Sequence, residues 1–403
     1  MQTSIPVELL NHPDIAEADA ILRSCVHCGF CNATCPTYQL LGSELDGPRG
    51  RIYLIKEMLE TGQASDRTRL HLDRCLTCRA CETTCPSGVR YGRLIDIGRE
   101  MVEEKAPRSI AEKLLRKAML IVIPYTARMS VALTLARLAR PLLPLQLQKK
   151  IPAKQVASTT PAPRHARRML VLAGCIQPLS TPNTNAAAAR VLDRLGISLI
   201  SAPSAGCCGA LNQHLSDIEG ARTMMRRNID AWWPHVENGA EAIVMTASGC
   251  GLMVKDYGAA LKDDAAYAHK AARISGLTHD ISEILNGEAL DSLAHIGQGT
   301  RVAYQSSCTL QHGQKLGGAV EAILQRCGYQ LTPVADSHLC CGAAGTYTLL
   351  QAKLSQQLLK NKLAALHHGN PAIIASANVG CQMHLASASH LPVKHWIELL
   401  EKG

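Results

Sequence analysis

Eight cysteines in the N-terminal quarter of the chain follow one pattern twice, Cys-x2-Cys-x2-Cys-x3-Cys-Pro. Three thiolates spaced in this way can bind three irons of one four-iron cubane, whereas the fourth, beside proline, reaches the other cluster. The spacing therefore predicts two 4Fe-4S clusters. We assign cluster 1 to Cys25, Cys28, Cys31 and Cys85, and cluster 2 to Cys75, Cys78, Cys81 and Cys35.

A pair of zinc sites is the alternative, because Cys-x2-Cys pairs also form zinc ribbons. Zinc requires neither the third cysteine of each run nor the proline that follows both runs, so the clusters are favoured. Four arginines lie near these cysteines in sequence and either raise the potential of a reduced cluster or form a solvated basic face. They are Arg49, Arg51, Arg79 and Arg90.

The composition indicates a globular protein of two to four domains. The chain has 403 residues, 47% of them hydrophobic and 19% charged, with a formal net charge of +9. Only 3% of the residues are aromatic, so no basic and aromatic stripe suggests a nucleic-acid partner. The N-terminus lacks the layout of a secretory signal, and we expect a cytoplasmic protein whose 17 cysteines bind metal or act as catalytic groups.

The remaining nine cysteines reveal an internal repeat. Cys175, the pair Cys207-Cys208 and Cys250 recur as Cys308, the pair Cys340-Cys341 and Cys381, at offsets of 133, 133 and 131 residues. Each copy alternates short apolar runs with helix-length patterns, which predicts a parallel sheet. The strands are expected near 169–173, 197–201 and 242–246 in the first copy, and near 302–304, 329–334 and 372–376 in the second. The cysteines then follow the carboxyl ends of strands, where open parallel sheets bind ligands.

These patterns predict an α+β multidomain protein. A mostly helical ferredoxin-type domain is expected at 1–105, an amphipathic helical connector and linker at 106–166, and two α/β cysteine-rich modules with parallel sheets at 167–290 and 291–403. The duplication implies a pseudo-two-fold arrangement of the two modules.

Two resemblances support this organisation. The residues 25–85, with a helical pattern between the two runs, are similar to the di-cluster domain of succinate dehydrogenase-type iron-sulfur subunits. The duplicated pattern Cys-x31-Cys-Cys-Gly-x40-Cys, with x38 in the second copy, resembles the cysteine-rich CCG domain. Heterodisulfide reductases and the iron-sulfur subunits of membrane-linked 2-hydroxyacid and glycerol 3-phosphate dehydrogenases share that domain.

The domain order, and the text from Cys28 to Tyr38, most closely resemble the iron-sulfur subunits of bacterial glycolate oxidase. The resemblance implies an electron-transfer subunit without catalytic residues of its own. Separate FAD-containing subunits would oxidise glycolate to glyoxylate, and this chain would pass electrons toward the membrane quinone pool. An equivalent subunit for lactate or glycerol 3-phosphate stays open, because the substrate is chosen on another chain.

The chain departs from the complete CCG pattern, which ends Cys-x2-Cys. Met253 and His384 occupy the fifth ligand position of the first and second copies. Imidazole binds iron or zinc well and a thioether binds weakly, so a third iron-sulfur or zinc centre is expected first in the second copy. Its donors would be Cys308, Cys340, Cys341, Cys381 and His384, with Cys175, Cys207, Cys208 and Cys250 as the weaker set. The departure disfavours thiol/disulfide reductase chemistry. Inert buried thiols are the alternative, and Cys327 is expected to be core.

Two further features bear on function. Neither G-x-G-x-x-G nor a P-loop motif is present, which agrees with substrate oxidation elsewhere. Residues 112–150 combine apolar runs with basic residues and a single acid, Glu112, a pattern typical of helices that lie on an anionic membrane surface. We therefore expect peripheral association with the inner face of the cytoplasmic membrane, although packing against the CCG modules or the flavoprotein explains the pattern equally well.

Overall fold

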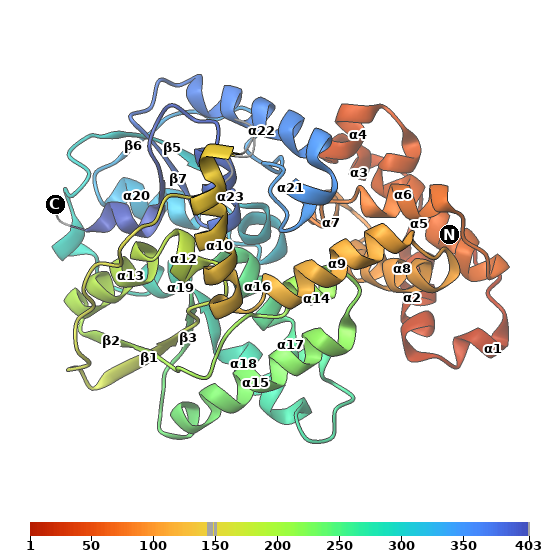
Figure 1. The fold of residues 1–403 in the computed structure, drawn as a ribbon, viewed down its shortest axis with the longest axis horizontal. Coiled ribbons are helices and arrows are strands. Elements are labelled where there is room, and N and C mark those ends of the chain that lie inside the picture. Colours follow the sequence, from red (N-terminus) through yellow and green to blue (C-terminus); the bar gives the residue numbers. More distant parts are fainter. Residues whose placement is uncertain (143–147, 149–150, 402–403) are drawn as a thin grey trace. The chain divides into compact units, whose positions relative to one another are not determined.

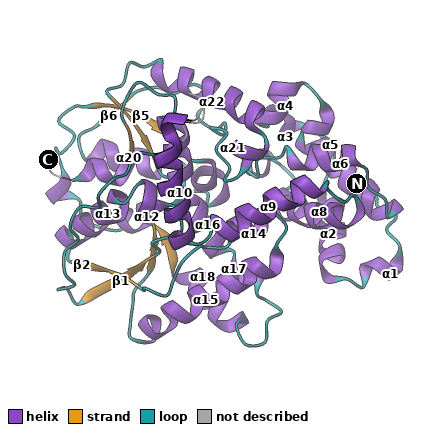
Figure 2. Ribbon diagram, in the orientation of Figure 1, coloured by secondary structure: helices purple, strands orange, loops and turns teal. Residues whose placement is uncertain are grey.

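The computed structural model describes residues 1–142, 148 and 151–401 and contains two compact units. The first unit comprises Met1–Arg116 with two short segments from farther along the chain, His214–Ser216 and His338–Lys362. The second comprises Lys117–Gln213, Asp217–Ser337 and Leu363–Gly403. The described strands all belong to the second unit (Figure 2), so the mixed α/β class expected from the sequence is confirmed.

The N-terminal part of the first unit is helical. Prolines at the first helical positions of α2, α4 and α5 favour helix initiation, because their missing N–H would have no partner there. Helix α5 buries Ile52, Ile55, Met58 and Leu59, and Gly98 of α8 lets the Ile55 side chain approach its backbone. The helices are α1 (Val7–Leu10), α2 (Pro13–Ser24), α3 (Phe30–Ala33), α4 (Pro36–Leu41), η1 (Glu44–Asp46), α5 (Pro48–Thr61), α6 (Asp66–Asp73), α7 (Ala80–Thr84) and α8 (Tyr91–Lys105).

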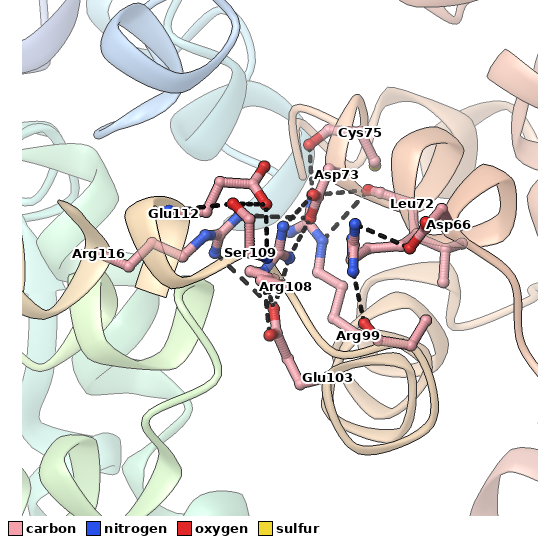
Figure 3. Close-up of polar contacts among 12 residues, drawn as sticks. Asp66, Leu72, Asp73, Cys75, Arg99, Glu103, Arg108, Ser109, Glu112 and Arg116 are labelled. Carbon is pink, nitrogen blue, oxygen red and sulfur yellow. Dashed lines mark hydrogen bonds and ion pairs between the residues drawn. The ribbon is translucent and has the colours of Figure 1, made fainter. Parts of the chain in front are cut away.

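The connector begins at a buried ion-pair network in the first unit (Figure 3). Arg108, almost fully buried, binds Asp73 at 2.6 and 2.8 Å and Glu103 at 2.7 Å, and Arg116 lies 3.5 Å from Asp73. Since a buried arginine needs charged partners, this network fixes the chain where it leaves α8.

The predicted amphipathic connector contains two helices, α9 (Ile110–Val122) and α10 (Thr126–Ala139), followed by η2 (Arg140–Leu142). Residues 143–147 and 149–150 of the predicted basic stretch lie outside the described residues. In the described part of the chain, no single helix is long and apolar enough to cross a membrane. Only when taken together do Ile110–Val122 and Thr126–Leu142 have the length and the apolar composition of a membrane span, and the chain bends by 111° between them.

Each cysteine-rich module contains one four-stranded parallel sheet (Figure 1). The strand orders, β2-β1-β3-β4 and β6-β5-β7-β8, are the same. The first module has β1 (Arg167–Val171), α12 (Gln177–Ser180), α13 (Asn183–Arg194), β2 (Ile197–Ser201), α14 (Ala210–His214), α15 (Ile218–Glu237), β3 (Ile243–Met245), α16 (Ser248–Lys255), α17 (Tyr257–Ala260), α18 (Ala268–Leu277), β4 (Thr278–Asp280), α19 (Ile281–Asn286) and η3 (Asp291–Leu293).

The second module repeats this order with fewer helices. It has β5 (Arg301–Gln305), the π-helical turn η4 (Thr309–Gly313), α20 (Ala319–Arg326), β6 (Gln330–Leu331), α21 (Tyr347–Leu350), α22 (Ala352–His367), β7 (Ile373–Ser376), α23 (Val379–Ala386), β8 (Val393–His395) and η5 (Trp396–Leu400). The six predicted strands are all present. The edge strands β4 and β8 were missed because each has three residues, mostly polar, and no apolar run that would predict a strand.

The sheets share one hydrophobic core in the second unit. Equivalent elements contact each other reciprocally: α16 packs on η4 and α23 on α12, while α13 packs on η5 and α20 on α19. Val191 and Leu192 of α13 and Ile323 and Leu324 of α20 belong to the same buried cluster. This reciprocity is what a pseudo-two-fold relation between the modules requires.

Candidate iron-sulfur sites

The first cavity gathers thiols from both N-terminal runs. Cys25, Cys28 and Cys31 line it together with Cys85 of the second run, and Cys81 also reaches its wall. The contact between α3 and α7 brings the two runs together. The four thiols of the cluster 1 assignment therefore surround one space, although ligation of iron stays a prediction.

The second cavity gathers the complementary set. Cys75, Cys78 and Cys81 line it together with Cys35 of the first run. Cys35 directly precedes α4 and Cys85 directly follows α7, so each fourth cysteine is carried by its helix toward the other run. The cavity linings thus place Cys85 with the first run and Cys35 with the second, while the crossed ligation of iron stays a prediction.

The loops that carry these thiols have an unusual backbone in both runs. His27 and Gly29 have positive φ of 57° and 86°, and the equivalent Thr77 and Arg79 have φ of 51° and 59°. Left-handed backbone is costly for a β-branched residue such as threonine. In the second run the Thr77 amide donates to the Cys75 sulfur at 3.4 Å. The strained turn of the second run therefore aims a backbone donor at a thiol, an arrangement that stabilises negative charge on sulfur.

Burial makes these thiols poor acids without a metal. It raises the pKa of Cys31 to about 11, with Cys25 and Cys28 adding to the rise, and it raises the pKa of both Cys78 and Cys81 well above the usual value. Iron that binds here must therefore displace protons. Among the described residues, no three His, Cys, Asp or Glu side chains converge around a single metal ion. Four thiols around a shared space suit a cluster, in which each iron takes one thiolate, better than one zinc ion.

The arginines near the cysteines separate into two kinds. The Arg51 side chain is only 1% exposed. It donates to the Cys35 sulfur at 4.0 Å, to Thr37 Oγ1 at 3.1 Å and to the His71 carbonyl at 2.7 Å. Arg90 is mostly exposed and pairs with Glu17. The solvated-face interpretation is therefore right for Arg90, whereas Arg51 places a buried positive charge beside a predicted cluster 2 ligand.

In the first CCG module, four thiols meet at the carboxyl edge of the sheet. Cys175 follows β1, Cys207 and Cys208 follow β2, and Cys250 lies on α16 after β3. A hydrogen bond with Cys207 raises the pKa of Cys175, and the pKa of Cys208 is raised by hydrogen bonds with Cys207 and Cys250. The hydrogen bonds from Cys175 and Cys208 lower the pKa of Cys207.

The fifth position of the first module differs from the cysteines around it. Met253 is buried within the hydrophobic core cluster that also contains Cys208 and Tyr257. Two buried polar side chains hold the backbone of the paired cysteines. Asn228 donates to the Cys207 carbonyl at 2.9 Å, and Tyr257 donates to the Cys208 carbonyl at 2.8 Å. The Cys-Cys turn is thus held independently of any ligand.

In the second module the expected donors belong to different units. Cys340 and Cys341 lie in the first compact unit, and Cys308, Cys381 and His384 lie in the second. The Asn378 amide donates to the Cys381 sulfur at 3.6 Å. The outlying cysteine of this module, Cys327, is fully buried in the shared core, as predicted.

Both Cys-Cys-Gly turns need glycine, as expected from the sequence. Gly209 and Gly342 have φ of 91° and 88°. A Cβ on Gly342 would lie 2.8 Å from the Ser355 carbonyl oxygen, closer than packing allows. The Gly342 amide donates to the Cys340 sulfur at 3.4 Å, so this turn also supports charge on sulfur.

Comparisons with known proteins agree with this geometry. A 4Fe-4S dicluster domain matches residues 21–89, and a cysteine-rich domain matches residues 169–255 and 302–386. The glycolate oxidase iron-sulfur subunit of Escherichia coli is 55% identical over 404 residues, which cover 100% of this chain and 99% of the relative. The chain belongs to the family of glycolate oxidase iron-sulfur subunits.

More distant members of the comparison share less of the chain. The probable glycolate oxidase iron-sulfur subunit of Bacillus subtilis is 28% identical, covering 90% of this chain and 88% of the relative. Lactate utilization protein A of Bacillus licheniformis is 25% identical, covering 52% of this chain and 87% of the relative.

The sequence analysis missed several residues that form hydrogen bonds to the candidate cluster-binding cysteines of this chain. The Tyr91 hydroxyl, almost fully buried, donates to the Cys75 sulfur at 3.6 Å. Arg99 donates to the Cys75 carbonyl at 2.6 Å, from the network drawn in Figure 3. Neither residue belongs to a cysteine motif, so the spacing of the cysteines gave no signal for it. Asn228 could have been found from the sequence, because it is a polar residue on the otherwise apolar buried face of α15.

Proposed function

We propose that this chain is the electron-transfer subunit of a flavin-dependent glycolate oxidase. Two cavities, each lined by a crossed set of four thiols, carry the proposal. The eight cysteines assigned above would hold two 4Fe-4S clusters, which supply one-electron carriers when bound. FAD-containing subunits would oxidise glycolate to glyoxylate, and membrane quinone would accept the electrons. The full-length similarity to a glycolate oxidase subunit favours glycolate over lactate or glycerol 3-phosphate.

In this function the chain's own residues tune and shield the carriers. Arg51 places positive charge beside Cys35, and Tyr91 and the Thr77 amide donate to Cys75. Each contact stabilises negative charge and so favours the reduced cluster. The protein offers these contacts from fixed elements, so little rearrangement is needed when an electron arrives.

Reduction by substrate tests the function. In the anaerobic complex with the flavin-containing subunits, glycolate is expected to bleach the visible absorbance of the iron-sulfur clusters, whereas lactate and glycerol 3-phosphate act much more slowly. Dithionite serves as the positive control for reducible clusters. Bleaching by lactate or glycerol 3-phosphate alone would reassign the substrate, and no bleaching by any of the three would contradict the electron-transfer role.

We also propose that the chain has the four parts expected from the sequence, 1–105, 106–166, 167–290 and 291–403. We further propose a third metal centre in the second CCG module. Four thiols and one imidazole are a stronger donor set for iron or zinc than four thiols and a thioether. In the first module, Met253 packs in the core, which supports this preference.

Iron counting tests the third centre. Anaerobic wild-type protein is expected to contain more than about eight irons per chain, the number that two cubanes supply. Replacing both Cys340 and Cys341 by Ser should lower the count to about eight, whereas the matched Cys207→Ser and Cys208→Ser pair should change it less. About eight irons before and after the first pair of changes would mean that the second module carries no iron.

A further part of the proposal is peripheral binding to the inner face of the cytoplasmic membrane. Leu114 of α9 and Val131, Leu135 and Leu138 of α10 are exposed large apolar residues. They alternate with basic residues, among them Arg128 and Arg137. Exposed apolar area together with positive charge favours binding to an anionic membrane surface. Because these side chains are exposed, packing inside the chain's own core does not explain the apolar pattern.

Vesicle sedimentation tests the membrane proposal. The complex is expected to sediment with anionic vesicles at low ionic strength and to be released as salt increases. Replacing Leu135 and Leu138 by Ser should weaken sedimentation several-fold, whereas the same change at Val7, an exposed apolar residue of α1, should not. Failure of the wild-type complex to sediment at low ionic strength would contradict the proposal.

A further inference from the structure

The two cavities of the predicted clusters share one wall. Pro48, Cys81 and Tyr91 line both of them. Pro48 begins α5, Cys81 lies in α7 and Tyr91 begins α8, so three helices meet at this wall. Cys81 is assigned to cluster 2 and yet borders the cavity of cluster 1. The shared wall is therefore the part of the protein that borders both predicted clusters.

Tyr91 is the aromatic member of this wall, and the surrounding structure holds it in place. Its side chain is buried, with 4% exposed. The amide of the next residue, Gly92, donates to Glu82 Oε1 of α7 at 2.5 Å, and a Cβ on Gly92 would lie 2.7 Å from Arg79 Nε. The first turn of α8 is therefore fixed against the helix that carries Cys81.

The Tyr91 hydroxyl favours one side of the wall. It donates to the Cys75 sulfur at 3.6 Å, and Cys75 lines the second cavity but not the first. From the same helix, Arg99 donates to the Cys75 carbonyl at 2.6 Å. A neutral thiol sulfur is a weak acceptor, whereas hydrogen bonds to charged acceptors are stronger. The Tyr91 hydrogen bond therefore strengthens as negative charge on the sulfur increases, which is the change that reduction of cluster 2 brings.

The charges around the second cavity act in the same direction. Arg51 lines that cavity and shares the buried carboxylate of Asp46 with Arg74, so that this group as a whole stays positive. At the first cavity, Arg49 is partly exposed and is balanced by Glu44 at 2.6 Å. Solvent screens such a surface pair. The hydroxyl and the buried charges therefore both favour an electron on cluster 2.

We propose that Tyr91 is a positioning residue that biases the sharing of electrons between the two clusters toward cluster 2. The proposal rests on the electron-transfer function given above. When one electron crosses the shared wall, it leaves cluster 1 oxidised and adds one unit of negative charge to cluster 2, and no covalent bond changes. The Tyr91 hydroxyl keeps its proton throughout and binds the Cys75 sulfur more strongly after the transfer.

Potentiometric titration of the anaerobically purified complex, followed by paramagnetic resonance of each cluster, tests the proposal. Tyr91→Phe keeps the ring in the wall and removes the hydroxyl. The one-electron equilibrium between the clusters should shift about tenfold toward cluster 1, which corresponds to a fall of about 59 mV in the cluster 2 potential. The cluster 1 potential and the iron content should stay unchanged. Tyr53→Phe is the matched control, because this exposed tyrosine of the same unit lines neither cavity, and both potentials should then equal the wild-type values.

A purely structural role of Tyr91 predicts a different result. Because the ring lines both cavities, a packing defect should disturb both clusters. Equal shifts of the two potentials in Tyr91→Phe, or an unchanged cluster 2 potential, would overturn the proposal. The titration uses dithionite and mediators instead of glycolate, so this outcome is distinct from a failure of the proposed function, which reduction by substrate detects.

A second variant decides the matter if Tyr91→Phe loses a cluster. Replacement of Tyr91 alone by 3-fluorotyrosine keeps the ring and the hydroxyl at nearly the same size and makes the hydroxyl a stronger hydrogen-bond donor. The cluster 2 potential should then rise, opposite to the change in Tyr91→Phe, and the cluster 1 potential should stay the same. A cluster 2 potential that falls or does not change in the fluorinated variant would contradict the role of the hydroxyl.

Discussion

Replacing Cys85 by Ser is expected to abolish or severely damage cluster 1, the cluster of the Cys25, Cys28 and Cys31 run, and to leave cluster 2 in place. The reason is that Cys85 lines the cavity of the first run, while Cys75, Cys78 and Cys81 line the other cavity with Cys35. Serine keeps the size of the side chain and removes the thiolate that iron needs. Electron paramagnetic resonance and iron analysis of anaerobic protein measure the loss.

Cys327→Ser is the matched control, because this thiol lies in the shared core of the CCG modules and should not affect either cluster. Cys35→Ser gives the reciprocal result, loss of cluster 2. Loss confined to the centre of the Cys75, Cys78 and Cys81 run in the Cys85 variant would contradict the crossed assignment.

Replacing Arg51 by Gln should lower the reduction potential of cluster 2 by about 100 mV. A unit charge about 6 Å from the centre of a buried charge, at an effective dielectric constant of about 20, contributes about 2 to 3 kcal/mol. For a one-electron centre, a tenfold change in equilibrium is about 59 mV. The variant loses positive charge beside Cys35, so adding an electron becomes less favourable. Potentiometric titration followed by paramagnetic resonance measures the shift.

Arg90→Gln tests whether any nearby arginine would have the same effect. Arg90 is mostly exposed and paired with Glu17, so solvent screening should reduce its influence to a small fraction of the Arg51 shift. In Arg51→Lys the reduction potential of cluster 2 should stay close to the wild-type value, because lysine keeps the positive charge. An unchanged cluster 2 potential in Arg51→Gln, or an equal shift in cluster 1, would refute the assignment.

The parts of the fold that the sequence predicted well depend on short-range spacing. Cysteine positions predicted which thiols would share a cavity, and apolar runs at 169–173 and 242–246 predicted the strands β1 and β3. Of the four edge strands, β2 and β6 were predicted, whereas β4 (Thr278–Asp280) and β8 (Val393–His395) escaped because they are short and partly polar. Edge strands make hydrogen bonds on one side only and need less apolar character.

The support around the candidate sites was less predictable, because it depends on contacts between residues far apart in the chain. The buried Arg51 is held by hydrogen bonds to Thr37 and to the His71 carbonyl and by an ion pair with the buried Asp46 at 3.7 Å, and no local pattern distinguishes it from the exposed Arg90. The left-handed backbone of Thr77 contradicts local preference and places its amide 3.4 Å from the Cys75 sulfur. The hydrogen bond from Tyr347 to the Arg74 carbonyl connects residues 273 positions apart, so no local sequence pattern predicts it.

The discontinuous first unit has a consequence for how the protein is made. Met1–Arg116 leaves the ribosome long before His338–Lys362, the segment that completes the same unit. At about 5 to 20 residues per second, the intervening chain takes tens of seconds or less to synthesise. During that interval the thiols of the second run lack the cover that includes Tyr347. In the nascent chain these cysteines are therefore accessible before the segment His338–Lys362 can pack with Met1–Arg116.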